Sequence, residues 1–309
     1  MFGKRLIKSN DEGGGIILAP DPNLMNVESQ ILNIPGSTYR YTGIHIDKLN
    51  GEYFYYSNSN GASNNTGFSL VQMTTPYDVS TASVLGQSAN TASNSYQLCM
   101  GGDKTGNNIA GTGYSNSGNP TGKRVVRFEI QPSFTVPQTP IYNTRFSEYQ
   151  NFSGITFNGN GTKVLYTNID GQFIESILSS PYNIDSAATN NVYNINDYTT
   201  QEFSASVRFV PFGIDWSGDG RSLYMGIVSY DANVGPYGSF YNTFLKCFDA
   251  STPYDVTTLY ERPLSTSKVL DTWFYGDYAY DISVTDNGKV AIIKQQNNGA
   301  PKQVYIFSE

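Results

Sequence analysis

Reactive side chains recur at corresponding positions of five strand-like segments. Alternation along these segments places one polar or reactive residue of each on the same side: His45, Cys99, Thr156, Asp215 and Ser283. Two residues further along, a second set follows: Asp47, Gly101, Asn158, Ser217 and Thr285. A Cys, a His and an Asp together could form a nucleophilic centre or bind a metal ion. No local catalytic signature surrounds them, and a polar wall that holds ordered water is the simpler interpretation.

Carboxylates could instead support glycoside hydrolysis, whose two acids need only be close in space. Glu175, Glu202 and Glu261 show no pairing pattern along the sequence. Asp219 and Asp286 lie in Gly-containing turns without the Asp-rich run of a calcium loop, so we expect them to form turns. The sequence therefore predicts no cofactor and no metal ion, and it leaves a glycan hydrolase open as an alternative.

Two insertions are candidate binding segments. Gly101–Arg124 is rich in Gly, Asn, Ser and Thr, and Asp231–Thr243 contains several aromatic residues. Long loops on a rigid scaffold are where binding residues concentrate, although a surface loop without a role is equally common. The candidate ligand contacts are Tyr114, Asn116, Tyr237, Phe240 and Tyr241.

The elements that position these residues are repeats. One turn sequence, Thr-Pro-Tyr-Asp-Val-Ser-Thr-Ala at 75–82, returns in close variants at 180–187 and 252–259. Proline fixes φ at the start of the turn, and the Asp or Asn side chain can accept a hydrogen bond from the backbone two residues on. A β-branched residue then leads toward the next strand. Such repetition indicates a repeat protein.

Five units can be aligned, each with four strands. Their first strands are expected at Tyr41–Asp47, Tyr96–Gly102, Ser153–Asn158, Phe212–Ser217 and Tyr280–Asp286. The last unit lacks its Pro turn and fourth strand at the C-terminus, and matching pieces stand near the N-terminus, at 21–32. The sequence therefore predicts an all-β, five-bladed β-propeller closed by an N-terminal strand. Six blades or a β-sandwich are the alternatives, and a sandwich does not explain this permutation.

Bulk composition narrows the possible partners. The 309 residues carry a net charge of −7, and the only basic cluster is Lys4, Arg5 and Lys8. Nucleic acid is therefore an unsuitable partner. No apolar run approaches the ~20 residues of a membrane span, and the apolar run at 16–18 is too short for a signal peptide. We expect a protein that neither inserts into membranes nor uses that secretion route.

The first twenty residues differ from the repeats. Basic and apolar residues precede three consecutive glycines, which is typical of an arm joined by a hinge, although a frayed terminus is equally compatible. We divide the chain into an arm at 1–20 and a single propeller domain at 21–309. The candidate docking residues are Phe2, Lys4, Arg5, Leu6 and Ile7.

The repeats resemble those of tail-fibre and other appendage proteins of marine tailed phages, cyanophages among them. Gly154–Lys163 matches their Gly-Ile-x-Phe strand with its Gly-Thr-Lys turn, and 75–82 matches their turn almost residue for residue. The opening Met1–Ile7 is similar to a leader of such virion proteins. The resemblance spans 21–309 and is strongest in the first, third and fourth units.

The resemblance implies a virion structural protein, assembled in the host cytoplasm and exposed on the particle in several copies. The arm would attach to other virion proteins, and the propeller would bind a host receptor or surface glycan. A purely structural part that contacts only virion subunits is the alternative. The family carries no catalytic residues that could be transferred to this chain.

Overall fold

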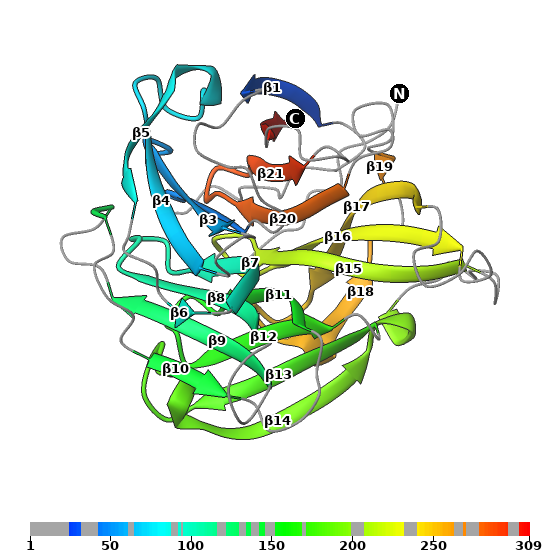
Figure 1. Cartoon of the computed structure of the whole chain (residues 1–309). Coiled ribbons are helices and arrows are strands. Elements are labelled where there is room, and N and C mark those ends of the chain that lie inside the picture. The colour runs from blue at the N-terminus through cyan, green and yellow to red at the C-terminus, as the bar shows by residue number, and fades with distance from the viewer. Residues whose placement is uncertain are drawn as a thin grey trace, which may run out of the picture.

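The chain folds into small antiparallel sheets around a common axis (Figure 1). The computed structural model describes residues 25–31, 43–60, 65–87, 92–93, 95–115, 122–129, 134–136, 142–145, 152–168, 171–198, 207–231, 240–262, 268–269, 278–295 and 303–309. Within these ranges the strands form five sheets, one for each predicted repeat unit. No helix in the described ranges is long and apolar enough to cross a membrane.

Each sheet runs from an inner strand at the axis to an outer strand. The first contains β2 (Ile44–Ile46), β3 (Tyr53–Asn60), β4 (Asn65–Met73) and β5 (Ala82–Gln87), with β6 (Ala92–Ser93) beside β4. The second contains β7 (Ser95–Gly102), β8 (Asn108–Ser115), β9 (Gly122–Glu129) and β10 (Tyr142–Arg145). The third contains β11 (Phe152–Phe157), β12 (Lys163–Asn168), β13 (Gln172–Leu178) and β14 (Ala187–Asn194).

The last two sheets follow the same plan. The fourth contains β15 (Val207–Trp216), β16 (Ser222–Asp231), β17 (Phe240–Ala250) and β18 (Leu259–Glu261), with β19 (Lys268–Val269) beside β17. The fifth contains β20 (Tyr278–Val284), β21 (Val290–Gln295), β22 (Gln303–Ser308) and β1 (Asn26–Ile31). The β-propeller prediction is confirmed.

The ring closes through the first described strand. β1 pairs with β22 from Asn26 opposite Ser308 to Ile31 opposite Val304. Figure 1 shows β1 beside the C-terminal end of the chain. The predicted N-terminal closing strand is therefore present, and it covers the edge that β22 would otherwise expose.

One of the two predicted insertions requires correction, and the other is described only at its ends. Gly101–Arg124 is not one long loop, because β8 occupies 108–115 and β9 begins at 122. For Asp231–Thr243, β16 ends at Asp231 and β17 begins at Phe240, and 232–239 lie outside the described residues. Gly- and Asn-rich composition indicated loops, but pairing with neighbouring strands decides the conformation of such segments.

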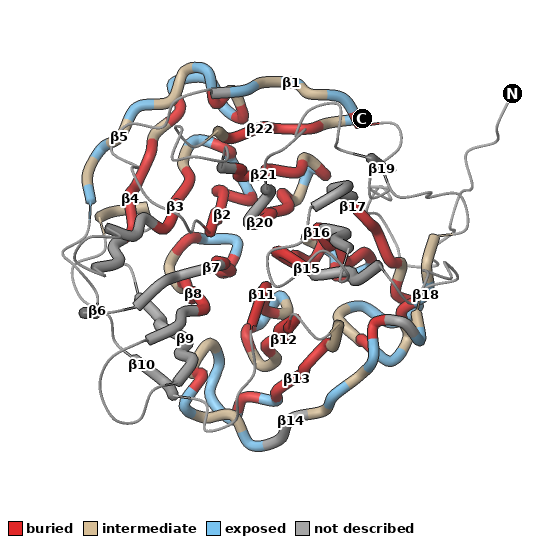
Figure 2. Tube along the Cα trace, turned by 45° about the vertical axis from the view of Figure 1, so that its right-hand side comes forward, coloured by how far each residue is buried: buried red, intermediate tan, exposed pale blue. Residues whose placement is uncertain are grey.

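The apolar core lies between neighbouring sheets. Buried residues gather on the inner strands, whereas the outer strands β5 and β14 carry many exposed residues (Figure 2). Ile44 and Ile46 of the first sheet pack with Ile293 and Ile306 of the fifth. Because successive side chains of a strand point to opposite faces, one face of each inner strand packs against the neighbouring sheet and the other faces the axis.

The repeated Pro-Tyr turn forms the same structure in three sheets. Tyr77, Tyr182 and Tyr254 adopt left-handed φ angles of 62°, 57° and 58°. Their backbone N–H groups donate to the carbonyls of Gly51, Gly161 and Gly220. The next residue, Asp or Asn, accepts a hydrogen bond from the N–H two residues on, as predicted. The turn therefore connects the outer part of a sheet to its innermost hairpin.

Each of these tyrosines covers a glycine of that hairpin. A Cβ placed on Gly51 would lie 2.2 Å from the Tyr77 ring, and one on Gly220 would lie 2.3 Å from Tyr254. The second sheet uses Phe134, with φ 50°, over Gly106. The sequence predicts a degenerate turn for the second unit at 131–136, without a Pro-Tyr pair, and Phe134 takes the position of the tyrosine there. The shared requirement is an aromatic ring over a glycine.

We predict that Tyr77→Ala lowers the free energy of unfolding by about 3 kcal/mol, because a buried ring is lost and alanine inherits the left-handed φ. Tyr77→Phe keeps the ring and loses the hydroxyl that donates to the Leu49 carbonyl at 3.0 Å, which costs about 1 kcal/mol. Urea denaturation of both variants measures the difference. Equal losses would show that the ring does not provide most of the stabilisation.

Candidate functional site

Asp215 is the centre of a buried polar network at the axis. One carboxylate oxygen, Oδ1, accepts hydrogen bonds from Lys48 Nζ and Thr156 Oγ1, both at 2.7 Å. The other, Oδ2, accepts from the Val284 N–H at 2.8 Å and from Ser283 Oγ at 3.3 Å. These donors belong to the first, third and fifth sheets, so one carboxylate connects four sheets, its own included.

Lys48 was not predicted as a site residue. It follows Asp47 at the end of the first inner strand and is 7% exposed. Its ammonium forms an ion pair with Asp215, 167 residues along the chain. Nothing near Lys48 in the sequence signals that contact, because its partner is brought close only by ring closure.

His45 lies close to this network as a neutral imidazole. Its Nε2 is 3.0 Å from the Asp103 carbonyl oxygen, and its Nδ1 is buried without a hydrogen-bond partner among the described residues. Burial, reinforced by the charge of Lys48, lowers the pKa of His45 from 6.5 to about 4. An imidazole with this pKa is uncharged at neutral pH and does not belong to an ion pair.

We predict that the imidazole C–H resonances of His45 titrate near pH 4. The chain holds one His, so its NMR signals need no assignment. Because the unfolded state takes up this proton near pH 6.5, the contribution of His45 to stability is present above pH 6.5 and is lost as the pH falls toward 4. The free energy of unfolding, measured against pH for the parent protein and for His45→Gln, isolates that contribution. A midpoint near 6.5 in the folded protein would contradict the buried neutral state.

Cys99 lies one layer further along the axis than His45. Asp47 and Asp103 occupy the same position after their strands, because the N–H of each donates to the carbonyl oxygen of the first residue of the following strand. The residue that corresponds to His45 is therefore Gly101. The register shift between Gln97 and Cys99 also occurs in the third and fifth sheets, so the sequence alignment itself placed Cys99 two residues too close to the hairpin. The Cys99 thiol donates to the Ser153 carbonyl, and burial raises its pKa well above the usual range.

Asp281 shares the layer of Cys99. Its Oδ2 accepts hydrogen bonds from the N–H groups of Met100 at 2.6 Å and Ile44 at 2.9 Å. Burial raises the pKa of this carboxyl well above its ordinary value, and its Oδ1 has no partner in the described part of the chain. The predicted combination of Cys99, His45 and Asp215 is therefore divided between two layers, because Cys99 lies in a different layer from the other two. The Cys99 thiol is protonated at neutral pH.

Glycines close the axis around Asp281. A Cβ on Gly43 would lie 2.5 Å from the Met100 nitrogen, and one on Gly101 would lie 2.3 Å from the Ile155 carbonyl oxygen. Gly213, with φ 60°, would bring a Cβ to 2.5 Å from the Ile282 nitrogen. These approaches are to backbone atoms, so the inner strands leave no space for a side chain at these three glycines.

The second predicted set forms turns. Asp47 Oδ1 accepts from the N–H groups of Leu49 and Asn50, and Asn158 Oδ1 accepts from the Lys163 N–H. Ser217 and Thr285 bind the backbone of their own hairpins in the same way. These side chains therefore cap the innermost hairpins and are not free for a ligand.

The other acidic candidates are paired or serve turns. Glu175 bonds Lys163 at 3.2 Å, and Glu261 bonds Lys246 at 3.1 Å. Asp219 accepts hydrogen bonds within its own turn, as expected. Glu202 lies outside the described residues. Within the described ranges, no three His, Cys, Asp or Glu side chains gather as a metal site.

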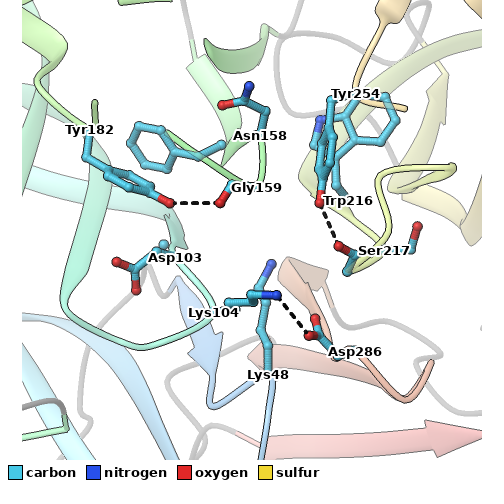
Figure 3. A pocket seen from close by; sticks show the side chains of 13 residues that line it. Lys48, Asp103, Lys104, Asn158, Gly159, Tyr182, Trp216, Ser217, Tyr254 and Asp286 are labelled. Atoms are coloured by element: carbon cyan, nitrogen blue, oxygen red, sulfur yellow. Dashed lines mark hydrogen bonds and ion pairs between the residues drawn. The ribbon is translucent and has the colours of Figure 1, made fainter. Parts of the chain in front are cut away.

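A small recess opens at the end of the axis formed by the innermost hairpins (Figure 3). Its empty space of about 310 Å³ includes open solvent, and hairpins of all five sheets contribute to its wall. The wall consists of Lys48, Gly102, Asp103, Lys104, Phe157, Asn158, Gly159, Tyr182, Trp216, Ser217, Gly218, Tyr254 and Asp286. No sequence pattern marked it, because each hairpin supplies only a few of these residues.

The structure does not describe the side chains of the remaining predicted site residues. Phe2, Lys4, Arg5, Leu6, Ile7, Asn116 and Tyr237 lie outside the described residues. Tyr114 belongs to β8, and Phe240 and Tyr241 belong to β17; the positions of these three side chains also lie outside the description.

Comparisons with known proteins show the fold alone. No family model and no curated protein matches the sequence. The endo-arabinase from Bacteroides thetaiotaomicron VPI-5482 superposes with a TM-score of 0.51 at 15% identity, covering 90% of this chain and 96% of that one. An exo-beta-1,3-galactanase from Phanerochaete chrysosporium gives 0.48 at 12% identity and covers 90% of this chain, which spans 64% of the galactanase. The Myceliophteria thermophila Cps50 (Swd1) β-propeller domain gives 0.44 at 9% identity, covering 92% of this chain and 99% of the domain.

Proposed function

We propose that this chain is a phage particle protein whose propeller binds a host-surface glycan or receptor and whose residues 1–20 attach it to the particle. The observation that favours binding over catalysis is the state of the axial acids. Asp215 accepts hydrogen bonds from five residues, and Asp281 is fully buried. Acids held in this way stiffen a scaffold and do not reach a substrate.

A hydrolase is the second candidate, favoured by one specific observation. Asp215 forms an ion pair with Lys48, whereas burial raises the pKa of Asp281, and the two residues lie on adjacent inner strands. Two acids in such different environments are typical of acid–base pairs. Their burial argues against this role, because a glycan must contact both groups.

The proposal is tested with the full chain and with phage particles. We expect the purified protein to bind host cells or their polysaccharide without releasing reducing sugar. Deletion of residues 1–12 should retain that binding and abolish incorporation into particles. A chain that is incorporated but does not bind the host is a purely structural component. Release of reducing sugar from arabinan or host polysaccharide that Asp281→Asn abolishes would establish the hydrolase.

A further inference from the structure

We infer that the recess at the hairpin end of the axis, referred to below as the axial recess, binds one residue of a neutral saccharide. This inference rests on the proposed function, since it gives the glycan a binding site. Residues of every sheet line the recess, and the structure describes them. It does not describe the side chains of the candidate contacts in the insertions. The recess is small and open to solvent, so it can receive part of a single sugar ring and not a longer saccharide.

The charges in the axial recess favour a neutral ligand. Lys48 is paired with Asp215, and Lys104 lies 3.7 Å from Asp286. The Asp103 carboxylate accepts hydrogen bonds from donors of its own turn. A charged ligand would have to separate one of these pairs, whereas a neutral polyol would not.

The wall combines aromatic and hydrogen-bonding groups. Tyr182 and Tyr254 lie on either side of the turn that contains Asn158 and Gly159, and their hydroxyls point toward the recess (Figure 3). Each hydroxyl donates to a backbone carbonyl, so its oxygen keeps the capacity to accept a further hydrogen bond. Apolar ring surface next to acceptors complements the C–H groups and hydroxyls of a sugar.

Asp286 provides an independent indication of a ligand. Its Oδ2 meets Lys104 only at 3.7 Å, and Lys104 is half exposed. Its Oδ1 is buried without a hydrogen-bond donor among the described residues. The χ2 torsion of Asp is soft, so a small rotation turns either oxygen toward the axial recess. A sugar hydroxyl would supply the donor that this carboxylate lacks.

Gly218 offers a way to fill the recess without changing any charge. A Cβ at this position would lie 2.1 Å from Asp286 Oδ1, so alanine must displace that carboxylate. Gly218→Ala therefore removes space and an acceptor together. Asp286→Asn is the second variant, because it keeps the shape and weakens the acceptor. Arg221→Ala is the matched control, since Arg221 is exposed on the same hairpin turn and does not line the recess.

The experiment titrates the full chain with D-glucose, D-galactose and D-mannose. D-glucosamine and N-acetylneuraminic acid serve as charged comparisons. Binding is followed by saturation-transfer NMR and by tryptophan fluorescence, because Trp216 lines the recess. We expect at least one neutral sugar to bind with millimolar affinity and the charged sugars to bind more weakly. Gly218→Ala and Asp286→Asn should each weaken binding about tenfold, with Arg221→Ala within twofold of the parent protein.

The outcomes separate this inference from the proposed function. If the protein binds host polysaccharide and neither variant affects any sugar, the glycan binds elsewhere and the axial recess is not its site. If a neutral sugar binds in the recess but the protein binds neither host cells nor their polysaccharide, the recess is a sugar site and the adhesion proposal fails. If no neutral sugar gives a signal at saturating millimolar concentrations, the inference is wrong.

Discussion

Lys48→Met is expected to lower the free energy of unfolding by about 3–5 kcal/mol, because it leaves a buried carboxylate without its cation. Asp215 would retain its hydroxyl and backbone donors, yet its charge would no longer be balanced. The donors that connect four sheets would then surround an uncompensated charge. Urea denaturation measured at pH 7 gives the loss.

Two comparisons make this expectation specific. Lys104→Met removes a cation from an exposed pair at 3.7 Å and should cost at most about 1 kcal/mol. The double variant Lys48→Met/Asp215→Asn should recover part of the loss, because it removes the unpaired charge together with its partner. If Lys48→Met were no more harmful than Lys104→Met, the axial ion pair would not stabilise the fold.

Gly213→Ala is expected to be more harmful still, at more than about 4 kcal/mol, and to reduce the soluble yield sharply. A Cβ there would lie 2.5 Å from both the Asp281 carboxylate and the Ile282 nitrogen. The second of these is backbone of the adjacent inner strand, which cannot move without opening the axis. The left-handed φ of 60° adds strain to the collision.

Gly171→Ala is the matched control for Gly213→Ala. Gly171 also has a left-handed φ, at 76°, but a Cβ there would meet nothing within 4 Å. Its substitution therefore reports the conformational cost alone, about 1–2 kcal/mol. Thermal unfolding of both variants separates the collision from the strain. Melting temperatures that agree within about 2 °C would contradict the close packing of the inner strands.

The sequence predicted those features that depend on local chemistry. The Pro-Tyr turns were predictable because proline and Asp or Asn favour the turn within a few residues. The closing strand was predictable because the repeat is visibly permuted between the chain ends. The turn of the second unit was predicted at 131–136 without its Pro-Tyr pair, but the match between Phe134 and the tyrosines was not, although Gly106 within a turn that begins at Asp103 was a usable signal.

The candidate site was less predictable because it depends on registration and long-range contact. The sequence alignment placed Cys99 beside His45, two residues out of step with the turn that begins at Asp103. Counting back from Asp103, the last residue before the turn, would have placed Gly101 there. The contact between Lys48 and Asp215 forms only when the sheets assemble around the axis, and no local pattern encodes it.

The pairing of β1 with β22 has a consequence for biosynthesis. β1 leaves the ribosome before the other described strands, and its partner β22 leaves after them. The nascent chain therefore carries an unpaired strand while the intervening sheets form. Closure joins segments at opposite ends of the described chain, so it carries the largest loop-closure entropy of the strand pairings that the structure describes. Cotranslational folding can then prepare the sheets, whereas closure of the ring has to wait until β22 has been synthesised.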